Sequence, residues 1–369
     1  MQITKQNNLS DWWERKDSPL LIAGPCSAES EMQVLNTARQ IAQSGKTSIF
    51  RAGVWKPRTR PGSFDGIGVT ALPWLEKVKE ETGLLVSTEV ASTFHVEQAL
   101  KHNIDVLWIG ARTTVNPFLV QELSESLRGA DIPVFIKNPI HEEIALWDGA
   151  IERFSQVGLN NIGAIHRGFF SSNSAPFRNI PSWSVAVELM RLYPDMPIIT
   201  DPSHIAGRRD LIAKICQTSL DLNFDGFIIE THNNPDVALS DAAQQITPSN
   251  LDDIMNRLCF KPETTGDEKY LGHLSELREN LNDIDEQFLQ ILSTRVKAVK
   301  EIEDFKSKNN VSSFEIKRLN EILKTRVLKG AELGLSEALV EDIYNTLFKN
   351  TFQMQTDISE NASTDPDNI

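Results

Sequence analysis

Residues 197–210 read Pro-Ile-Ile-Thr-Asp-Pro-Ser-His-Ile-Ala-Gly-Arg-Arg-Asp, and this stretch decides the fold. It begins as an apolar strand, stops abruptly at Asp201-Pro202, and then presents His204 and two arginines. In parallel α/β enzymes, the side chains at the carboxyl ends of the strands line the active site. The fold therefore depends on how many other apolar runs of the chain end in reactive side chains.

Short apolar runs alternate with longer amphipathic segments from Leu20 onward. The runs span residues 20–23, 48–54, 84–90, 106–111, 134–136, 161–165, 197–200 and 226–229. Continuous apolar runs are typical of parallel strands that are buried on both faces. Eight such units in about 240 residues predict a (β/α)₈ TIM barrel, an α/β fold. A doubly wound open sheet is the alternative, which the lack of a G-x-G-x-x-G motif after the first run disfavours.

The pattern changes after Cys259, where a charged linker leads into helical periodicity. Apolar residues recur at 3-4 spacing from Leu274 to Phe305 without Pro or Gly, which predicts a helix of roughly 45–50 Å. Two shorter helices, about 314–329 and 336–355, should be joined through Gly330 and Gly334. The expected domains are a barrel at 1–258, a linker at 259–272, an all-α three-helix domain at 273–356 and a disordered tail at 357–369.

The composition is that of a globular protein without a nucleic-acid or membrane partner. The chain has 369 residues, 40% of them hydrophobic, and its net charge of −14 includes no basic block. Its three cysteines form no C-x-x-C pair, which is typical of a reducing compartment. Because the N-terminus lacks an apolar signal region and no run approaches ~18 apolar residues, we expect a cytoplasmic protein.

Potential metal ligands follow several of the apolar runs. The carboxyl ends of parallel strands share one rim, so these side chains should converge. A thiolate, an imidazole and two carboxylates suit Mn²⁺, Fe²⁺, Co²⁺ or Zn²⁺ better than Mg²⁺. Each residue taken alone could be structural, as a buried cysteine usually is, but their joint occurrence at strand ends favours a metal site. The four expected ligands are Cys26, His204, Glu230 and Asp241.

The same rim should carry six cations that have no acidic partner close in sequence. Such a cluster would repel itself unless an anion filled the space, and phosphate and carboxylate match the arginine fork. The rim therefore predicts a site for two small phosphorylated substrates beside a Lewis-acid metal. Arg208 and Arg209 fit either a solvated helix start or a phosphate contact. The six cations are Arg51, Lys56, Arg58, Arg112, Lys137 and Arg167.

Six motifs occur together and in order over about residues 18–258. They are Gly-Pro-Cys-Ser (24–27), Lys-Pro-Arg-Thr (56–59), Ile-Gly-Ala-Arg (109–112), Asp-Pro-Ser-His (201–204), Gly-Arg-Arg (207–209) and Ala-Leu-Ser-Asp (238–241). As a set they resemble the short type I form of DAHP synthase. The related octulosonate 8-phosphate synthases typically carry Ala-Asn-Arg-Ser at the second motif, which disfavours them. Because only about nineteen residues precede the first strand, we expect no N-terminal regulatory domain.

The resemblance implies a metal-dependent barrel enzyme that joins phosphoenolpyruvate to erythrose 4-phosphate. Mn²⁺ is the first choice of metal, held by the four ligands named above. The resemblance implies that Arg58 and Thr59 contact erythrose 4-phosphate and that Lys56 and His204 act in catalysis. The expected phosphoenolpyruvate contacts are Lys56, Arg112, Lys137 and Arg167, and Arg51 joins the substrate-binding set.

The C-terminal helices resemble the all-helical chorismate mutase family over about residues 273–356, which implies conversion of chorismate to prephenate. Arg295 and Lys306 are eleven residues apart and fall within about 20° on one helix face. Arg278 lies about 100° away, which suits the family arrangement in which this arginine reaches the partner subunit's site. We therefore expect a homodimer through the helical domain. The implied site residues are Arg278, Arg295, Lys306, Glu315, Arg318, Thr351 and Gln355, with Arg278, Arg295, Lys306 and Gln355 catalytic.

Three departures from the mutase pattern bear on this expectation. Leu319 stands where the family usually has Glu, Glu315 where Asp is usual and Thr351 where Ser is usual. The expected function is a bifunctional shikimate-pathway enzyme, a transferase and an isomerase, with feedback through the helical domain. The alternative is a DAHP synthase whose helices form a non-catalytic dimerisation and ligand-sensing module, in which prephenate is an inhibitor.

Overall fold

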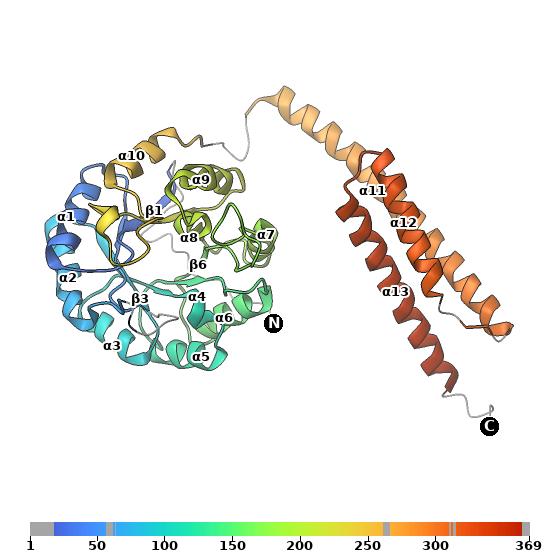
Figure 1. Ribbon diagram of the computed structural model, residues 1–369, viewed down its shortest axis with the longest axis horizontal. Coiled ribbons are helices and arrows are strands. Elements are labelled where there is room, and N and C mark those ends of the chain that lie inside the picture. Colours follow the sequence, from blue (N-terminus) through green and yellow to red (C-terminus); the bar gives the residue numbers. More distant parts are fainter. Residues whose placement is uncertain are drawn as a thin grey trace. The chain divides into compact units, whose positions relative to one another are not determined.

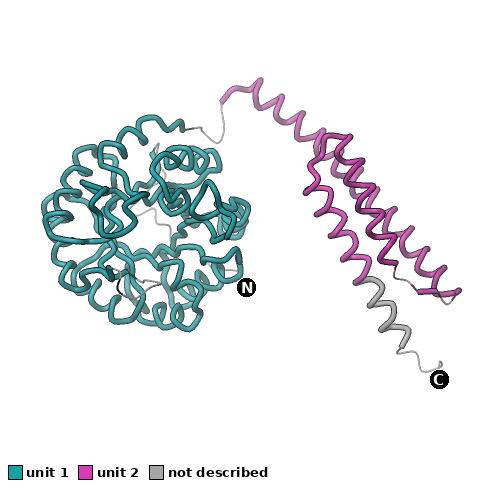
Figure 2. The backbone as a smooth tube through the Cα atoms, in the orientation of Figure 1, with its two compact units in different colours: residues 1–263 teal, residues 264–369 magenta. Residues whose placement is uncertain are grey.

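The computed structural model describes residues 18–56, 62, 64–260, 266–309, 311–312 and 315–363. The chain divides into two compact units, Met1–Glu263 and Thr264–Ile369, which Figure 2 colours separately. We call them the barrel unit and the helical unit and describe each by itself. Within the described residues, no helix combines the length and apolar character needed to cross a membrane.

The barrel unit is a closed barrel of eight parallel strands (Figure 1). Each strand pairs with the next in chain order, and β8 closes on β1, with Leu20 opposite Gly226 and Gly24 opposite Glu230. This topology confirms the predicted TIM barrel and excludes the open sheet. The strands are β1 (Leu20–Gly24), β2 (Ile49–Arg51), β3 (Leu85–Val90), β4 (Val106–Ile109), β5 (Val134–Lys137), β6 (Ile162–His166), β7 (Ile198–Thr200) and β8 (Gly226–Glu230).

Helices surround the strands and begin at ordinary capping residues. The side chains of Ser30, Ser92, Asn116 and Thr247 each accept a hydrogen bond from a backbone N–H of the first turn. The α-helices are α1 (Glu31–Ala42), α2 (Leu72–Thr82), α3 (Thr93–Lys101), α4 (Ala111–Thr114), α5 (Pro117–Ser126), α6 (Ile144–Gln156), α7 (Trp183–Leu192), α8 (Pro202–Ala206), α9 (Ile212–Asp221) and α10 (Pro248–Arg257). Single 3₁₀ turns lie at η2 (Gly68–Ala71), η3 (Arg209–Leu211) and η4 (Pro235–Val237).

Two apolar clusters lie on opposite faces of the strands. A small cluster fills the barrel interior, and a large one packs between strands and helices. Side chains alternate between these faces, so on β2 Ile49 points inward, Phe50 outward and Arg51 inward. Residues two positions apart on a strand point to the same face. Three more charged side chains therefore lie at the interior rim, each two residues after an inner apolar one: Lys137 after Phe135, Arg167 after Ile165 and Glu230 after Ile228.

The helical unit contains three helices, as predicted: α11 (Glu268–Lys308), α12 (Ile316–Glu332) and α13 (Glu337–Ser363). One expectation was wrong, because Gly330 is not part of a connection. It lies buried inside α12, where a Cβ would come within 2.4 Å of Val340 Cγ2, so glycine is needed for close helix packing. α13 continues to Ser363, through the first residues of the expected tail.

Candidate functional site

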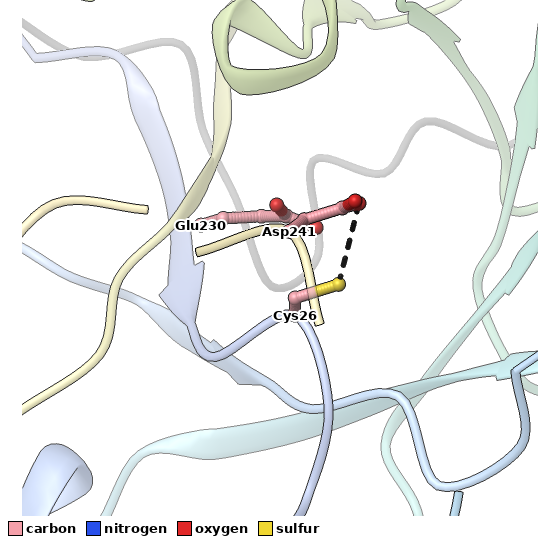
Figure 3. A group of neighbouring side chains, drawn as sticks. All are labelled: Cys26, Glu230 and Asp241. Carbon is pink, nitrogen blue, oxygen red and sulfur yellow. Dashed lines mark hydrogen bonds between the residues drawn. The ribbon is translucent and has the colours of Figure 1, made fainter. Parts of the chain in front are cut away.

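Four side chains from separate loops and strands converge at the carboxyl end of the barrel. Cys26, Glu230 and Asp241 each offer one ligand atom, and these atoms lie within 4.8 Å of one another (Figure 3). The Cys26 Sγ lies 3.6 Å from Asp241 Oδ2. The His204 Nε2 lies 3.8 Å from Glu230 Oε1 and 3.8 Å from Asp241 Oδ2. The structure thus brings together all four residues that the sequence assigned to a metal.

Asp201 orients the histidine of this group. Its Oδ1 caps α8 by accepting a hydrogen bond from the His204 backbone N–H, and its Oδ2 lies 2.8 Å from His204 Nδ1. Lys137 Nζ donates to the same Oδ2 at 2.7 Å. Burial alone would favour the neutral acid, but His204 and Lys137 hold the pKa of Asp201 well below its usual range. With Nδ1 directed at this carboxylate, Nε2 is left to face the other ligands.

The donor chemistry of the group fits a first-row divalent metal. Burial, followed by the charge of Glu230, raises the pKa of the Cys26 thiol to about 12. Burial acts against ionisation of Asp241 as well, yet His204 and Arg178 hold the pKa of its carboxyl below the usual value. One buried thiol, one imidazole and two carboxylates form a mixed set of soft and hard donors, which suits a transition metal better than Mg²⁺.

Two cations lie beside this group. Arg51 is almost fully buried, with Nη2 donating to Cys26 O at 3.2 Å and lying 3.4 Å from Glu230 Oε1. Its Cζ lies 4.9 Å from the centroid of the Trp108 ring. Arg51 Nε and Nη1 are buried and find no hydrogen-bond partner among the residues that the structure describes. Lys56 Nζ donates to Cys26 O at 3.1 Å. The unsatisfied guanidinium nitrogens indicate an anion site here.

The other predicted cations divide into two groups. Lys137 and Arg167 are buried at the rim, and Arg167 Nη1 donates to Asn179 Oδ1 at 2.9 Å. Burial lowers the pKa of Arg167 from 12.5 to about 10, so it stays charged at neutral pH. Arg112 lies exposed in α4, directly after β4. Arg58 and Thr59 lie outside the described residues.

The rim cations have no acidic partner close in sequence, but Arg51 and Lys137 pair with carboxylates that are distant in the chain. Arg51 pairs with Glu230 and Lys137 pairs with Asp201, in both cases through side chains that are almost fully buried. The barrel brings together residues that are far apart in the chain, so local sequence could not reveal these pairs. The rim is therefore a network of paired charges, in which Arg51 Nε and Nη1 lack a hydrogen-bond partner among the described residues.

Further contacts come from Arg178, Gln244 and Gln245, which the sequence did not single out, and from Arg209, for which the sequence left a phosphate contact open. Arg178 Nη1 lies 3.2 Å from Asp241 Oδ1, and Gln244 Nε2 donates to Glu230 Oε2 at 2.7 Å. Gln245 Oε1 accepts from the Cys26 backbone N–H. Arg209 donates to the backbone oxygens of Gln245 and Ala242 and pairs with Asp236, so it fastens the loop after β8. Arg208 pairs with Asp210 on the surface.

In the helical unit, the fold joins two of the predicted mutase residues. Lys306, near the end of α11, pairs with Glu315 at the start of α12, with Nζ 2.7 Å from Oε1. A hollow of about 520 Å³ lies beside Lys306, lined by Ala298, Glu301, Ile302, Phe305, Lys306, Asn309 and Val311. This arrangement places a cation at the edge of a largely apolar space.

The remaining mutase residues are dispersed in the helical unit. Arg278 lies exposed on α11, and Arg295 is half-buried on the same helix. Arg318 Nη1 pairs with Glu321 at 2.8 Å, and Thr351 Oγ1 donates to Leu347 O within α13. Gln355 lies in α13, but its side chain is outside the described part of the chain.

Known proteins resemble about two thirds of the chain. A phospho-2-dehydro-3-deoxyheptonate aldolase of Thermotoga maritima is 31% identical over 226 residues, which cover 61% of this chain and 64% of that protein. A crystal structure of the Thermotoga maritima aldolase, described there as DAHP synthase, matches with a TM-score of 0.59 and 29% identity over 65% of this chain and 68% of that one. A 2-dehydro-3-deoxyphosphooctonate aldolase of Vesicomyosocius okutanii is 28% identical over 259 residues, 64% of this chain and 88% of that protein.

Two family models divide the chain between them. The DAHP synthetase I family matches residues 2–263, and chorismate mutase type II matches residues 277–356. The first match spans more than half of the chain and includes all four side chains of the metal group. The second spans most of α11, all of α12 and the first part of α13. The chain therefore belongs to the DAHP synthetase I family and carries a chorismate mutase type II domain after its barrel.

Proposed function

We propose that the barrel condenses phosphoenolpyruvate with erythrose 4-phosphate to give 3-deoxy-D-arabino-heptulosonate 7-phosphate and phosphate. The observation that carries this proposal is the buried guanidinium of Arg51, with two unpartnered nitrogens, beside the donor group of Cys26, Glu230 and Asp241. A cation site and an anion site that share one rim suit the joining of a phosphorylated enol to a phosphorylated aldehyde.

Within this proposal, Cys26, His204, Glu230 and Asp241 hold the divalent metal. Mn²⁺ is the first choice, and Fe²⁺, Co²⁺ and Zn²⁺ are the alternatives. A bound metal supplies Lewis-acid polarisation of the aldehyde oxygen. Asp201 keeps the imidazole of His204 turned toward the group by its contact with Nδ1.

The cations orient the two anions. We assign the phosphoenolpyruvate site to the strand-end cations, which hold its carboxylate and phosphate while C3 attacks the aldehyde carbon. Water then adds at C2, and the phosphate departs. We assign the erythrose 4-phosphate site to Arg58 and Thr59. The phosphoenolpyruvate contacts are Arg51, Lys56, Arg112, Lys137 and Arg167.

For the helical domain we propose the rearrangement of chorismate to prephenate, which is intramolecular and needs no general base. Arg295 and the partner's Arg278 would bind the substrate carboxylates, while Lys306 and Gln355 donate hydrogen bonds to the ether oxygen as its charge grows. The hollow beside Lys306 supports this assignment, since it offers apolar walls next to a cation. Glu315, Arg318 and Thr351 complete the proposed site.

We propose that this domain is a homodimer formed through α11. Over its described length this helix has no buried residue, although it carries apolar side chains along one face. Leu281, Ile284 and Phe288 are 57%, 60% and 47% exposed. Such a continuous apolar stripe requires a partner helix of matching length, and a second copy of α11 supplies it. The buried apolar side chains among the described residues of this unit are only Val340 and Phe348.

The three cysteines are all free thiols, which supports our proposal that the protein works in the reducing cytoplasm. We further propose that prephenate, bound by the helical domain, lowers the rate of the condensation. This coupling would also operate if the helices sensed ligands without turning them over.

One experiment on the purified full chain tests both activities. Loss of phosphoenolpyruvate in the presence of erythrose 4-phosphate should stop with a chelator and return with Mn²⁺, whereas loss of chorismate should be unaffected by the chelator. Condensation that persists in chelator would overturn the metal site. If chorismate is not consumed but prephenate still slows the condensation, the helices are a ligand-sensing module.

A further inference from the structure

The two carboxylates of the metal group each turn one oxygen toward the other ligands and have the second oxygen held from behind. Asp241 Oδ2 faces Cys26 Sγ and His204 Nε2, while its Oδ1 lies 3.2 Å from Arg178 Nη1. Glu230 Oε1 faces His204, while its Oε2 accepts from Gln244 Nε2 at 2.7 Å. Each carboxylate therefore has one oxygen that faces the other ligands, where a cation would bind, and one that is held by Arg178 or Gln244.

Arg178 and Gln244 are themselves joined. Arg178 Nη1 donates to Gln244 Oε1 at 2.6 Å, which orients the amide so that its NH₂ group faces the carboxylates. The same NH₂ group lies 2.7 Å from Glu230 and 3.4 Å from Asp241 Oδ2. A guanidinium and an amide thus form one chain of donors that reaches both carboxylates, which we call the carboxylate bracket.

The base of the bracket is fixed to the helix that carries His204. The backbone N–H of Arg178 donates to Ile205 O at 3.0 Å, and Asn179 Nδ2 donates to His204 O at 2.6 Å. The side chain packs so closely on α8 that a Cβ at Gly207 would lie 2.4 Å from Arg178 Cβ. The bracket therefore ties the two carboxylates to α8, so that all three ligands keep a common frame.

Asp241 needs such support because its backbone is in the left-handed region, with φ of 48°. This conformation is uncommon for a residue other than glycine and persists where surrounding contacts enforce it. The loop that contains it is held by Arg209 on one side and by Gln245 on the other. Arg178 adds a charged contact to the carboxylate itself, at Oδ1.

We propose that Arg178 and Gln244 are positioning residues that set the geometry of the two carboxylate ligands for the metal. This inference rests on the metal site of the proposed function and adds to it two residues from loops that no sequence motif marks. Groups that hold metal ligands from behind typically contribute about 10- to 100-fold to metal affinity. Neither residue needs to touch the substrate or the metal.

The test is a titration of the metal-free full chain with Co²⁺, followed by its absorption spectrum. Co²⁺ bound through Cys26 gives a thiolate charge-transfer band, and its visible bands report the ligand geometry. The variants are Arg178→Met and Gln244→Met, which keep an unbranched stem but remove the donors, together with Arg178→Lys. Arg191→Met is the matched control, because Arg191 pairs with Glu188 on the exposed face of α7. Circular dichroism and thermal unfolding confirm that each variant is folded.

Each Met variant should bind Co²⁺ about 10- to 100-fold more weakly and give altered visible bands, while the thiolate band remains at saturation. Arg178→Lys should fall in between, since it restores the charge without the fork. If wild type binds Co²⁺ normally and both Met variants show the same affinity and visible bands, the positioning role of Arg178 and Gln244 is wrong, while the metal site stands. The metal site itself fails if wild type gives no thiolate band or if Cys26→Ala retains it.

Discussion

The barrel unit and the helical unit differ in which side chains they bury and which they expose. The barrel buries ionised side chains such as Arg51, Glu230 and Asp201 and pairs them across its interior. The helical unit exposes a long apolar stripe on α11 and leaves Arg278 at its surface. The difference teaches that one chain brings the barrel's charged groups together, and it motivates our proposal that the mutase site is completed by a second copy.

The largest effect should come from breaking a buried pair in the barrel. Lys137→Met removes a proposed substrate contact and leaves the buried Asp201 carboxylate without its lysine partner. The rate of condensation should therefore fall about 10²- to 10³-fold. Loss of one partner of a buried pair should also lower barrel stability by about 3–5 kcal/mol. Chorismate turnover should be unchanged. Steady-state kinetics of both reactions and thermal unfolding provide the measurement.

Lys101→Met is the control for this substitution, because Lys101 forms an exposed pair with Glu97 on α3. It should alter neither reaction. Lys137→Arg keeps the positive charge beside Asp201, so it should retain the fold and still slow the condensation. It thereby separates loss of substrate binding from loss of folding. If both Lys137 variants condense at the wild-type rate, Lys137 does not bind phosphoenolpyruvate.

Substitutions in the helical unit should have the opposite selectivity, lowering chorismate turnover and sparing the condensation. Arg295→Ala and Lys306→Ala should each lower chorismate turnover about 100-fold, as expected for one lost electrostatic donor, and leave the condensation unchanged. Lys329→Ala is a suitable control, since Lys329 pairs with Glu332 in α12. Normal turnover in both variants would favour the ligand-sensing alternative for these helices.

The sequence predicted the fold and the rim side chains because strands impose simple periodicities. A run such as Val134–Lys137 is apolar until its last residue, and the alternation of faces then directs Lys137 inward beside Phe135. The order of the strands in a TIM barrel brings all such ends to one rim. For these reasons Cys26 and Glu230 could be placed together from their positions at strand ends.

The remaining contacts could not be predicted because they depend on tertiary structure. Arg178 and Gln244 occupy loops whose conformations are set by distant contacts, and their sequences contain no motif for metal chemistry. The sequence places Asp201 at the end of an apolar strand, but its pairing with Lys137 depends on β5 and β7 belonging to one barrel. The sequence predicts Gly330 in the connection between two helices, although it lies inside α12 and packs closely against Val340.

The exposed stripe on α11 allows a direct test of whether the mutase depends on association. Phe288→Glu places a charge in the proposed dimer interface, and an interface anchor of this kind costs 2 kcal/mol or more, about 30-fold in association. Chorismate turnover should then fall at low protein concentration, whereas condensation per chain should not. Sedimentation velocity over a dilution series measures the association.

Gln287→Glu introduces the same charge one residue away, about 100° around the helix, and should leave association intact. A dimer of unchanged strength in Phe288→Glu would place the interface elsewhere. A monomeric variant with normal mutase activity would show that Arg278 acts within its own chain.

The smallest effect concerns a buried histidine on the outer face of β6. The His166 ring lies among aromatic side chains, with the ring centroids of Trp183 and Phe169 at 5.2 and 5.8 Å. Burial lowers the pKa of His166 from 6.5 to about 3, and the Pro181 carbonyl offsets this only in part. The folded protein therefore keeps the ring neutral at pH values where the unfolded chain binds a proton.

Because the unfolded state binds more protons below its own pKa, the barrel should lose stability as the pH falls from 6.5 toward 3. At about pH 5.5, one unit below the unfolded value, the loss from this residue should be about 1.4 kcal/mol relative to neutral pH. His166→Phe should fit the aromatic surroundings and remove this part of the pH dependence. Urea unfolding of both proteins at neutral pH and at about pH 5.5 measures it.

The control is His273→Gln, at an exposed histidine of α11, which should show the wild-type pH dependence. A His166→Phe protein with the full wild-type pH dependence would contradict the assignment.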